Sequence, residues 1–168
     1  MEKALETHAA GVGVIATNAT VRSHIYRTEL HKICPELAVR EIAAPQLVPA
    51  IEGNDFAAAE RLAKEYAAQF DSVDGLILGC THYPFLSNVL KRELGSGTEL
   101  IDPSAAVARE LKHQLSKRGL LSDGAKGKEV FYISGDAEKH RAVIERLWNS
   151  EEALDLRSDP PATKATLS

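Results

Sequence analysis

The chain alternates short β-branched runs with longer segments of helical period, and this alternation limits the fold more than any other feature of the sequence. A repeated strand-then-helix order is typical of a parallel sheet covered by helices, because parallel strands need crossover connections. We therefore predict an α/β fold. The expected strands are residues 13–16, 39–42, 76–78, 99–101 and 130–133.

The segments that separate these strands carry apolar residues at helical spacing, so most of them are expected to be helices. The expected helices are residues 21–31, 55–70 (capped by Asn54), 84–94 (with Pro84 in its first turn and Gly95 after its end), 105–117 (capped by Ser104) and 137–148. After Asn149 the composition shifts to Ser, Asp, Pro and Thr. Residues 150–168 are therefore expected to be a disordered tail.

Composition excludes several classes of protein. The formal net charge of −4 over 168 residues leaves no broad basic face, so nucleic acid is not an expected partner. No apolar run approaches the roughly 20 residues that span a bilayer, and the N-terminal residues lack a signal-peptide core, so we expect a cytoplasmic protein without membrane contact. The two cysteines, Cys34 and Cys80, are expected to be free thiols.

The strand at residues 76–78 stops abruptly at a cysteine, a threonine and a histidine: Cys80, Thr81 and His82. Ligands of parallel α/β sheets bind beyond the carboxyl ends of the strands, where this turn and the Thr-rich segment 16–20 both lie. The two segments are therefore expected to face one pocket. A thiol at a helix N-terminus favours the thiolate, which suits a base or nucleophile, although a buried apolar cysteine is the alternative reading.

The neighbouring polar residues also have two readings each. His82 either transfers a proton and orients a substrate, or has a structural role. Thr17 and Thr20 either bind a small anion such as a carboxylate or merely cap a helix. Glu52 closes an unusually apolar loop that enters a helix, and it either approaches the same pocket or is a solvated residue at a helix start. No metal is expected, because the Cys-x-His unit lacks two further ligands at suitable spacing.

Five segments of the chain match motifs of one enzyme family. They are residues 74–86 (DGLILGCTHYPFL), 14–21 (VIATNATV), 45–52 (PQLVPAIE), 100–104 (LIDPS) and 131–136 (FYISGD). On these motifs, over residues 11–148, the chain resembles the glutamate racemases of the aspartate/glutamate racemase family. The first of the five is highly specific.

The resemblance implies a three-layer, parallel-sheet α/β domain and a cofactor-independent interconversion of L- and D-glutamate, which supplies the D-isomer for peptidoglycan. Two cysteines on opposite faces of the substrate exchange the α-proton, and Cys80 would be the second of them. Glu52 would pair with His82 and support proton transfer. The implied site is catalytic Cys80, His82 and Glu52, with substrate contacts from Thr81, His82, Thr17 and Thr20.

The family's Asp-Ser-Gly, Pro-Tyr-Gly and Cys-Asn-Thr turns, the last carrying the first cysteine, are absent from this sequence. The resemblance then implies that residues 1–10 are a remnant of an interdomain helix, 11–101 a complete α/β domain with Cys80, and 102–149 a returning segment of an incomplete second α/β domain. This chain is expected to be inactive alone and to need a complementing N-terminal half. A homodimer is also possible on this reading, and unpaired apolar edges predict a poorly soluble or oligomeric chain.

Two other functions stay open from the residues alone. The chain is either a non-catalytic remnant that binds glutamate or a protein partner, or a hydrolase in which Cys80 and His82 are nucleophile and base. The close spacing of this pair in the sequence disfavours the hydrolase.

Overall fold

The computed structural model describes residues 11–122, 124, 127–149 and 153–158. The chain divides into two compact units, residues 1–120 and 121–168. The first unit extends past the expected boundary at residue 101. The interdomain helix expected at residues 1–10 lies outside the described residues.

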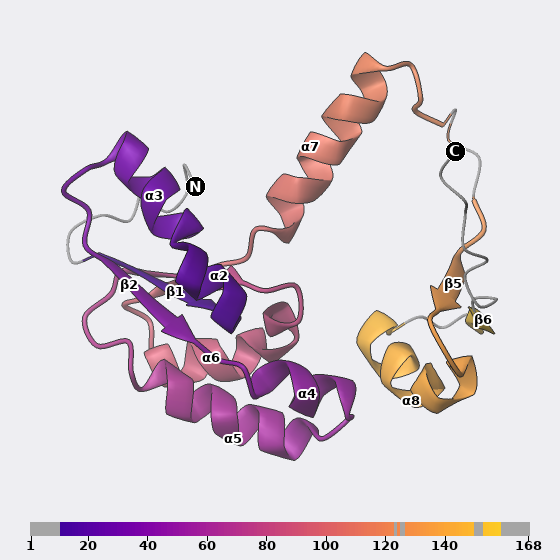
Figure 1. Ribbon diagram of the computed structural model, residues 1–168, viewed down its shortest axis with the longest axis horizontal. Coiled ribbons are helices and arrows are strands. Elements are labelled where there is room, and N and C mark those ends of the chain that lie inside the picture. Colours follow the sequence, from indigo (N-terminus) through magenta and orange to yellow (C-terminus); the bar gives the residue numbers. More distant parts are fainter. Residues whose placement is uncertain (1–10, 123, 125–126, 150–152, 159–168) are drawn as a thin grey trace, which may run out of the picture. The chain divides into compact units, whose positions relative to one another are not determined.

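A four-stranded parallel sheet in the order β2-β1-β3-β4 forms the centre of the first unit (Figure 1). Its strands are β1 (Val12–Ala16), β2 (Val39–Ala43), β3 (Gly75–Gly79) and β4 (Glu99–Ile101). Ala16 at the end of β1 pairs with both Ala43 and Gly79. The segments that follow β1, β2 and β3 therefore leave the sheet from the same edge, and the predicted α/β fold is confirmed.

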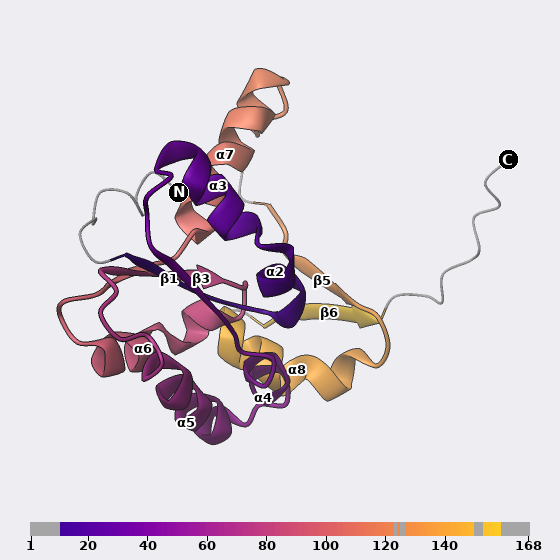
Figure 2. The ribbon, with the colours of Figure 1, turned by 60° about the vertical axis from the view of Figure 1, so that its left-hand side comes forward.

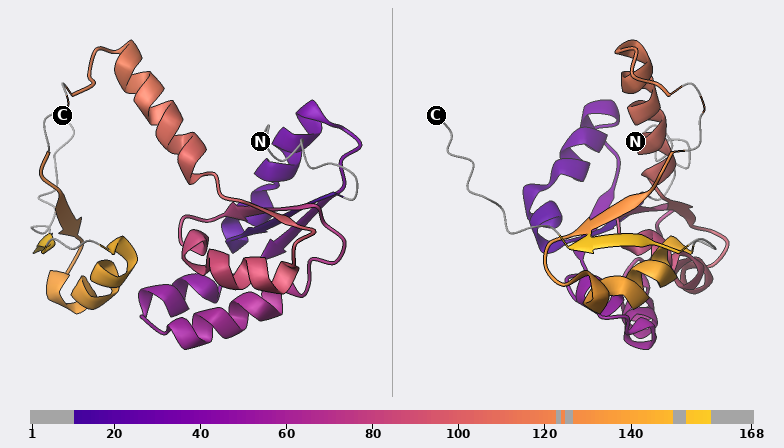
Figure 3. Two further views of the ribbon diagram at one scale, coloured as in Figure 1. Left: turned by 180° about the vertical axis from the view of Figure 1, so that it is seen from behind. Right: turned by 90° about the vertical axis from the view of Figure 1, so that its right-hand side faces the viewer.

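Helices cover both faces of this sheet (Figures 1 and 2). Helices α2 (Asn18–Ser23) and α3 (Ile25–Ile33) lie on one face. The other face carries α4 (Leu47–Glu52), α5 (Phe56–Ala67), the 3-10 turn η1 (Tyr83–Leu86) and α6 (Ser87–Leu94), as the left view of Figure 3 also shows. The last helix of the unit, α7 (Ser104–Lys117), buries none of its residues.

The core beneath α2 and α3 follows from strand alternation. Val12, Val14 and Ala16 of β1 point to this face and pack with Leu30 of α3 and Ile77 of β3. Strand residues of the opposite alternation point to the α5 and α6 face, where Ile15, Leu76 and Leu78 are fully buried or nearly so. Because β1 is buried on both faces, its sequence is continuously apolar, as is typical of a central parallel strand.

Four local predictions differ from the structure. The single helix expected at residues 21–31 is two helices, because His24 takes the left-handed conformation (φ 50°) that ends α2. The apolar segment 45–52, expected to be a loop, contains helix α4. Asp55, not Asn54, caps α5 by accepting a hydrogen bond from Ala58 N–H at 3.0 Å.

The fourth difference concerns Ser104, which is the first residue of α7 and not its cap. The Asp102 carboxylate accepts hydrogen bonds from the Ser104 amide (2.9 Å) and hydroxyl (2.6 Å), so an acid two residues upstream satisfies the helix start.

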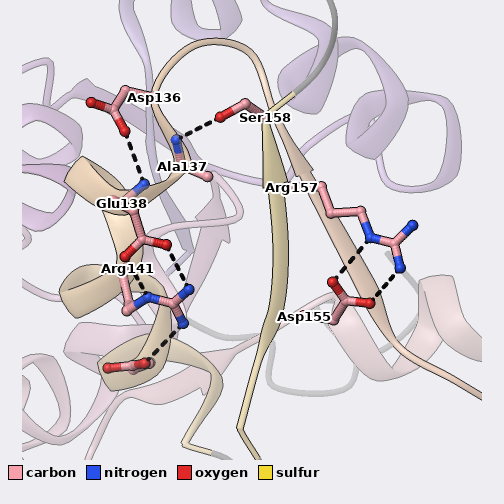
Figure 4. Close-up of polar contacts among 8 residues, drawn as sticks. Asp136, Ala137, Glu138, Arg141, Asp155, Arg157 and Ser158 are labelled. Atoms are coloured by element: carbon pink, nitrogen blue, oxygen red, sulfur yellow. Dashed lines mark hydrogen bonds and ion pairs between the residues drawn. The ribbon is translucent and has the colours of Figure 1, made fainter.

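The second unit contains β5 (Val130–Ile133), α8 (Ala137–Trp148) and β6 (Asp155–Ser158) (Figure 4). Strands β5 and β6 pair in parallel, and the Ser158 hydroxyl accepts a hydrogen bond from the Ala137 amide at 3.1 Å. The disordered tail expected from residue 150 is therefore wrong for residues 155–158, where ladder bonds and this helix contact order the backbone. Residues 150–152 and 159–168 lie outside the described residues.

No helix in the part of the chain that the structure describes is both long and apolar enough to cross a bilayer.

Candidate active site

Three segments meet at the edge of the sheet where β1, β2 and β3 end (Figure 1). They are residues 17–20 at the start of α2, residues 44–52 up to the end of α4, and residues 80–83 at the start of η1. Parallel pairing aligns these ends, although more than 20 residues separate each segment from the next in sequence. The strand register thus places the polar residues predicted from the sequence at one edge of the sheet.

Cys80, His82 and Glu52 form a row of contacts at this edge. The Cys80 Sγ atom lies 3.7 Å from His82 Nδ1, and His82 Nε2 lies 2.9 Å from Glu52 Oε1. In the tautomer with a proton on Nε2, this nitrogen donates to the Glu52 carboxylate and leaves the lone pair of Nδ1 facing the thiol. The row can therefore take a proton from the Cys80 thiol or return one to it.

The row is partly open to solvent. Cys80 is half-buried, the His82 side chain is 27% exposed, and the Glu52 side chain is 61% exposed. A side-chain hydrogen bond with this exposure gains little free energy by itself, because water competes for its donor and acceptor. The site is thus accessible to a small polar ligand, and its geometry must depend on the surrounding backbone.

Gly79 fixes how closely the Cys80 turn approaches its neighbours. A Cβ atom on Gly79 would lie 2.9 Å from the Ala16 Cβ and 3.1 Å from Cε2 of Tyr26. Only glycine fits between β1 and the Tyr26 ring at this point. Burial, and next the nearby Cys80 charge, raise the pKa of the Tyr26 phenol, which therefore stays neutral beside the thiol.

Thr17 and Thr20 lie at the same edge and contact each other. The Thr17 hydroxyl caps α2 by accepting from the Thr20 amide at 3.4 Å, and the two hydroxyl oxygens are 3.0 Å apart. The capping interpretation is therefore correct for Thr17. Both hydroxyls are only partly buried, so they also remain accessible to a ligand, and Thr81 is exposed.

Cys34 lies elsewhere. It follows the last residue of α3 and packs against the core cluster, and its carbonyl accepts a hydrogen bond from the Leu37 amide at 3.1 Å, so it lies just before β2, at the opposite end of that strand from Ala43. The structure therefore does not bring the two thiols together. Among the described residues, no three His, Cys, Asp or Glu side chains are grouped so that they could hold a metal ion.

Sequence reasoning missed three residues around this edge. Tyr26 falls within the helix expected at residues 21–31, and no local signal places its ring against Gly79. Tyr83 is part of the motif at residues 74–86, and nothing in that motif indicates that its side chain is fully buried. The side chain of Glu41 in β2 is 2% exposed and accepts hydrogen bonds from His24 Nδ1 at 2.7 Å and Arg27 Nε at 3.2 Å, which ties the junction of α2 and α3 to the sheet.

The sequence matches the family model described as Asp/Glu/Hydantoin racemase over residues 1–111. Among curated relatives, glutamate racemase 2 of Caldanaerobacter subterraneus subsp. tengcongensis is 38% identical over 138 residues, which are 80% of this chain and 52% of that protein. The glutamate racemase of Desulforudis audaxviator is 38% identical over 153 residues, 84% of this chain and 56% of that protein. The chain thus spans little more than half the length of these relatives.

Solved structures agree with these sequence matches. The glutamate racemase isoform RacE1 of Bacillus anthracis gives a TM-score of 0.78 at 30% identity, covering 93% of this chain and 60% of that one. The glutamate racemase of Francisella tularensis, solved in complex with D-glutamate, gives 0.78 at 32% identity with the same coverage. The strand order, the Cys80 edge and these matches lead to one conclusion: the chain belongs to the Asp/Glu/Hydantoin racemase family.

Proposed function

We propose that the protein is a glutamate racemase and that Cys80 is one of the two groups that exchange the α-proton of glutamate. The observation that carries this proposal is the contact row Cys80–His82–Glu52 at the carboxyl edge of the sheet. The names of the relatives, and the D-glutamate bound to the Francisella tularensis enzyme, support glutamate as the substrate.

In the proposed reaction the Cys80 thiolate removes the α-proton, so the C–H bond breaks and an S–H bond forms. The electron pair stays on the α-carbon as a planar carbanionic intermediate. A second acid returns a proton to the opposite face, and the two groups exchange roles in the reverse direction. Since Cys34 lies away from this edge, we place the second acid in a part of the whole protein beyond the described residues, supplied by a complementing N-terminal half.

His82 and Glu52 would set the protonation state of Cys80. With Glu52 accepting a hydrogen bond from Nε2–H, Nδ1 of His82 accepts the thiol proton before substrate deprotonation. The α-proton then occupies the Cys80 sulfur, and His82 returns its proton only after Cys80 has passed the α-proton on to solvent or to a carbanion and is a thiolate again. This arrangement gives a reactive thiolate without a cofactor or a metal ion.

The three threonines would hold the substrate. The neighbouring hydroxyls of Thr17 and Thr20 can turn from each other to donate to a carboxylate, and the exposed Thr81 hydroxyl lies between the two catalytic side chains in sequence. The D-glutamate formed would supply peptidoglycan synthesis, which places the reaction in the cytoplasm, and we expect the whole enzyme to act as a homodimer.

Proton exchange with solvent tests this proposal. L- and D-glutamate are incubated separately with the chain in D2O, and loss of the α-proton signal is followed by NMR. We expect Cys80 alone to exchange the proton of one enantiomer, and Cys80→Ser to lower that rate at least about 100-fold, because a positioned acid/base typically contributes this much. Cys34→Ser is the matched control and should keep the wild-type rate.

The contrary result is a folded wild-type chain that binds glutamate but shows no exchange dependent on Cys80. That outcome would favour the non-catalytic binding function. The hydrolase remains a second candidate because the 3.7 Å contact of Sγ with Nδ1 also suits a nucleophile and its base. It predicts Cys80-dependent hydrolysis of an unactivated alkyl ester of glutamate over many turnovers, with a transient acyl adduct on Cys80 detected by mass spectrometry, which the racemase proposal does not.

A further inference from the structure

The backbone of one buried residue connects the three segments that form the candidate site. Ala44, directly after β2, is fully buried. Its N–H donates to the Ala16 carbonyl at 2.8 Å, and its carbonyl accepts from the Tyr83 hydroxyl at 3.0 Å and from the Leu47 amide at 3.3 Å. Both backbone hydrogen-bonding groups of Ala44 are therefore used: its N–H reaches the end of β1, and its carbonyl reaches η1 and the start of α4.

Each of these bonds lies close to a proposed functional residue. Ala16 directly precedes Thr17, the cap of α2. Leu47 begins α4, the helix that ends at Glu52. Tyr83 directly follows His82. The hydrogen bonds of Ala44 thus end on the residues next to Thr17 and His82 and on the first residue of the helix that carries Glu52.

Tyr83 provides the longest of these connections. It reaches across 39 residues of sequence, its side chain has no exposed surface, and its own amide donates to the Cys80 carbonyl at 3.2 Å. Burial, followed by the charge of the nearby Cys80, raises the pKa of its phenol well above the ordinary value. The phenol is therefore protonated at any working pH and acts as a permanent donor, not as an acid or base in the reaction.

The exposed Glu52–His82 pair needs such a connection. Water competes for the 2.9 Å bond between these two side chains, so the bond by itself holds them only weakly. A buried hydrogen bond between the two backbone segments does not suffer this competition. It keeps α4 and the Cys80–His82 turn at a fixed separation whether or not the side-chain bond is made.

We propose that Tyr83 is a positioning residue, whose hydrogen bond to the Ala44 carbonyl holds His82 in reach of both Glu52 and Cys80. The catalytic meaning of this role rests on the proposed racemase function. The positioning itself is a property of the three segments and can be measured without substrate.

Tyr66 of α5 provides a matched control. Its hydroxyl donates to Gln46 Oε1 at 3.1 Å, so it also ties a tyrosine to the segment that carries Glu52. That bond is exposed and ends on a side chain, not on the Ala44 junction. Tyr66→Phe therefore also removes a tyrosine hydroxyl that donates to this segment, but it leaves the hydrogen bonds of Ala44 intact.

The test compares Tyr83→Phe with Tyr66→Phe in protein labelled with ¹⁵N-histidine, with the His82 signals assigned by their loss in His82→Gln. In wild-type protein we expect one His82 tautomer with a hydrogen-bonded Nε2 proton. Tyr83→Phe should lose at least half of this signal. It should also slow the alkylation of Cys80 by iodoacetamide at least threefold, measured in a Cys34→Ser background so that Cys80 is the thiol that reacts. Tyr66→Phe should change neither. Equal behaviour of the two variants would overturn the inference.

A measurement on unaltered protein covers the case in which Tyr83→Phe does not fold. The exchange rate of the Tyr83 hydroxyl proton is read from the deuterium isotope shift on its Cζ in ¹³C-tyrosine-labelled protein. Slow exchange, on the seconds scale, is expected for this buried donor, and fast exchange like that of an exposed phenol would overturn the inference.

The failure of this inference is distinguishable from the failure of the racemase proposal. Loss of the His82 signal in Tyr83→Phe, combined with no Cys80-dependent exchange of glutamate in wild-type protein, would remove the racemase proposal and leave the positioning role. Cys80-dependent exchange in wild-type protein with an unaltered His82 signal in Tyr83→Phe would keep the racemase and remove the positioning role.

Discussion

At the scale of single residues, the site depends on the absence of a side chain at Gly79 as much as on the thiol that follows it. Gly79→Ala would place a methyl group 2.9 Å from the Ala16 Cβ and 3.1 Å from the Tyr26 ring. Because β1 and β3 are both buried here, neither strand can move away cheaply. We expect a loss of about 1–3 kcal/mol in the free energy of unfolding, measured by urea denaturation.

The control for this substitution is Gly97→Ala. No atom lies within 4 Å of the position that a Cβ would take on Gly97. Its free energy of unfolding should stay within about 0.5 kcal/mol of the wild-type value. Equal stability of the two variants would show that the packing around Gly79 does not constrain the Cys80 turn.

At the scale of elements, helix α5 begins one residue later than the sequence alone suggested. The Asp55 carboxylate accepts from Ala58 N–H, and Asn54 before it takes the left-handed conformation (φ 59°). Asp55→Ala leaves that amide without its cap, so we expect a cost of about 0.5–2 kcal/mol in the free energy of unfolding. Glu60→Ala, on the exposed face of the same helix, is the control and should be neutral within about 0.5 kcal/mol. A larger loss in Glu60→Ala than in Asp55→Ala would contradict the assignment of the cap.

At the scale of the whole molecule, helix α7 carries exposed apolar side chains that would favour the predicted self-association. Val107 and Leu111 lie one helical turn apart and are 65% and 59% exposed. Exposed apolar pairs of this kind promote association between chains. We expect the wild-type chain to sediment as oligomers, and Val107→Glu/Leu111→Glu to shift it towards monomer in analytical ultracentrifugation.

The control for charge alone is Ala105→Glu/Ser116→Glu, which adds the same two charges to the opposite face of α7. This variant should remain oligomeric. A wild-type chain that is monomeric at all concentrations would refute the prediction, and an equal shift in both double variants would assign the effect to net charge and not to the apolar face.

The sequence by itself determined most of the helices and strands, and the part of the candidate site that contains Cys80 and His82. The β-branched runs, the helical period of 3.6 residues and the turn residues between them depend on local backbone physics, so strands β1 to β5 and most helices were predictable. Strand β6 was not, because its residues lie in a polar segment that was expected to be disordered. Cys80 and His82 are neighbours in the chain, so their joint position at a strand end was predictable too. The break at His24 and helix α4 were not, because contacts with Glu41 and burial of Leu47 and Ile51 decide them.

Only the tertiary structure decided how the three segments meet. The Glu52–His82 bond spans 30 residues, and the Tyr83–Ala44 bond spans 39. Neither leaves a local signal, because both depend on the parallel register that aligns the ends of β1, β2 and β3. The same register brings Gly79 against Ala16. The chemistry of this edge is thus encoded locally, whereas its geometry follows from packing between segments that are distant in sequence.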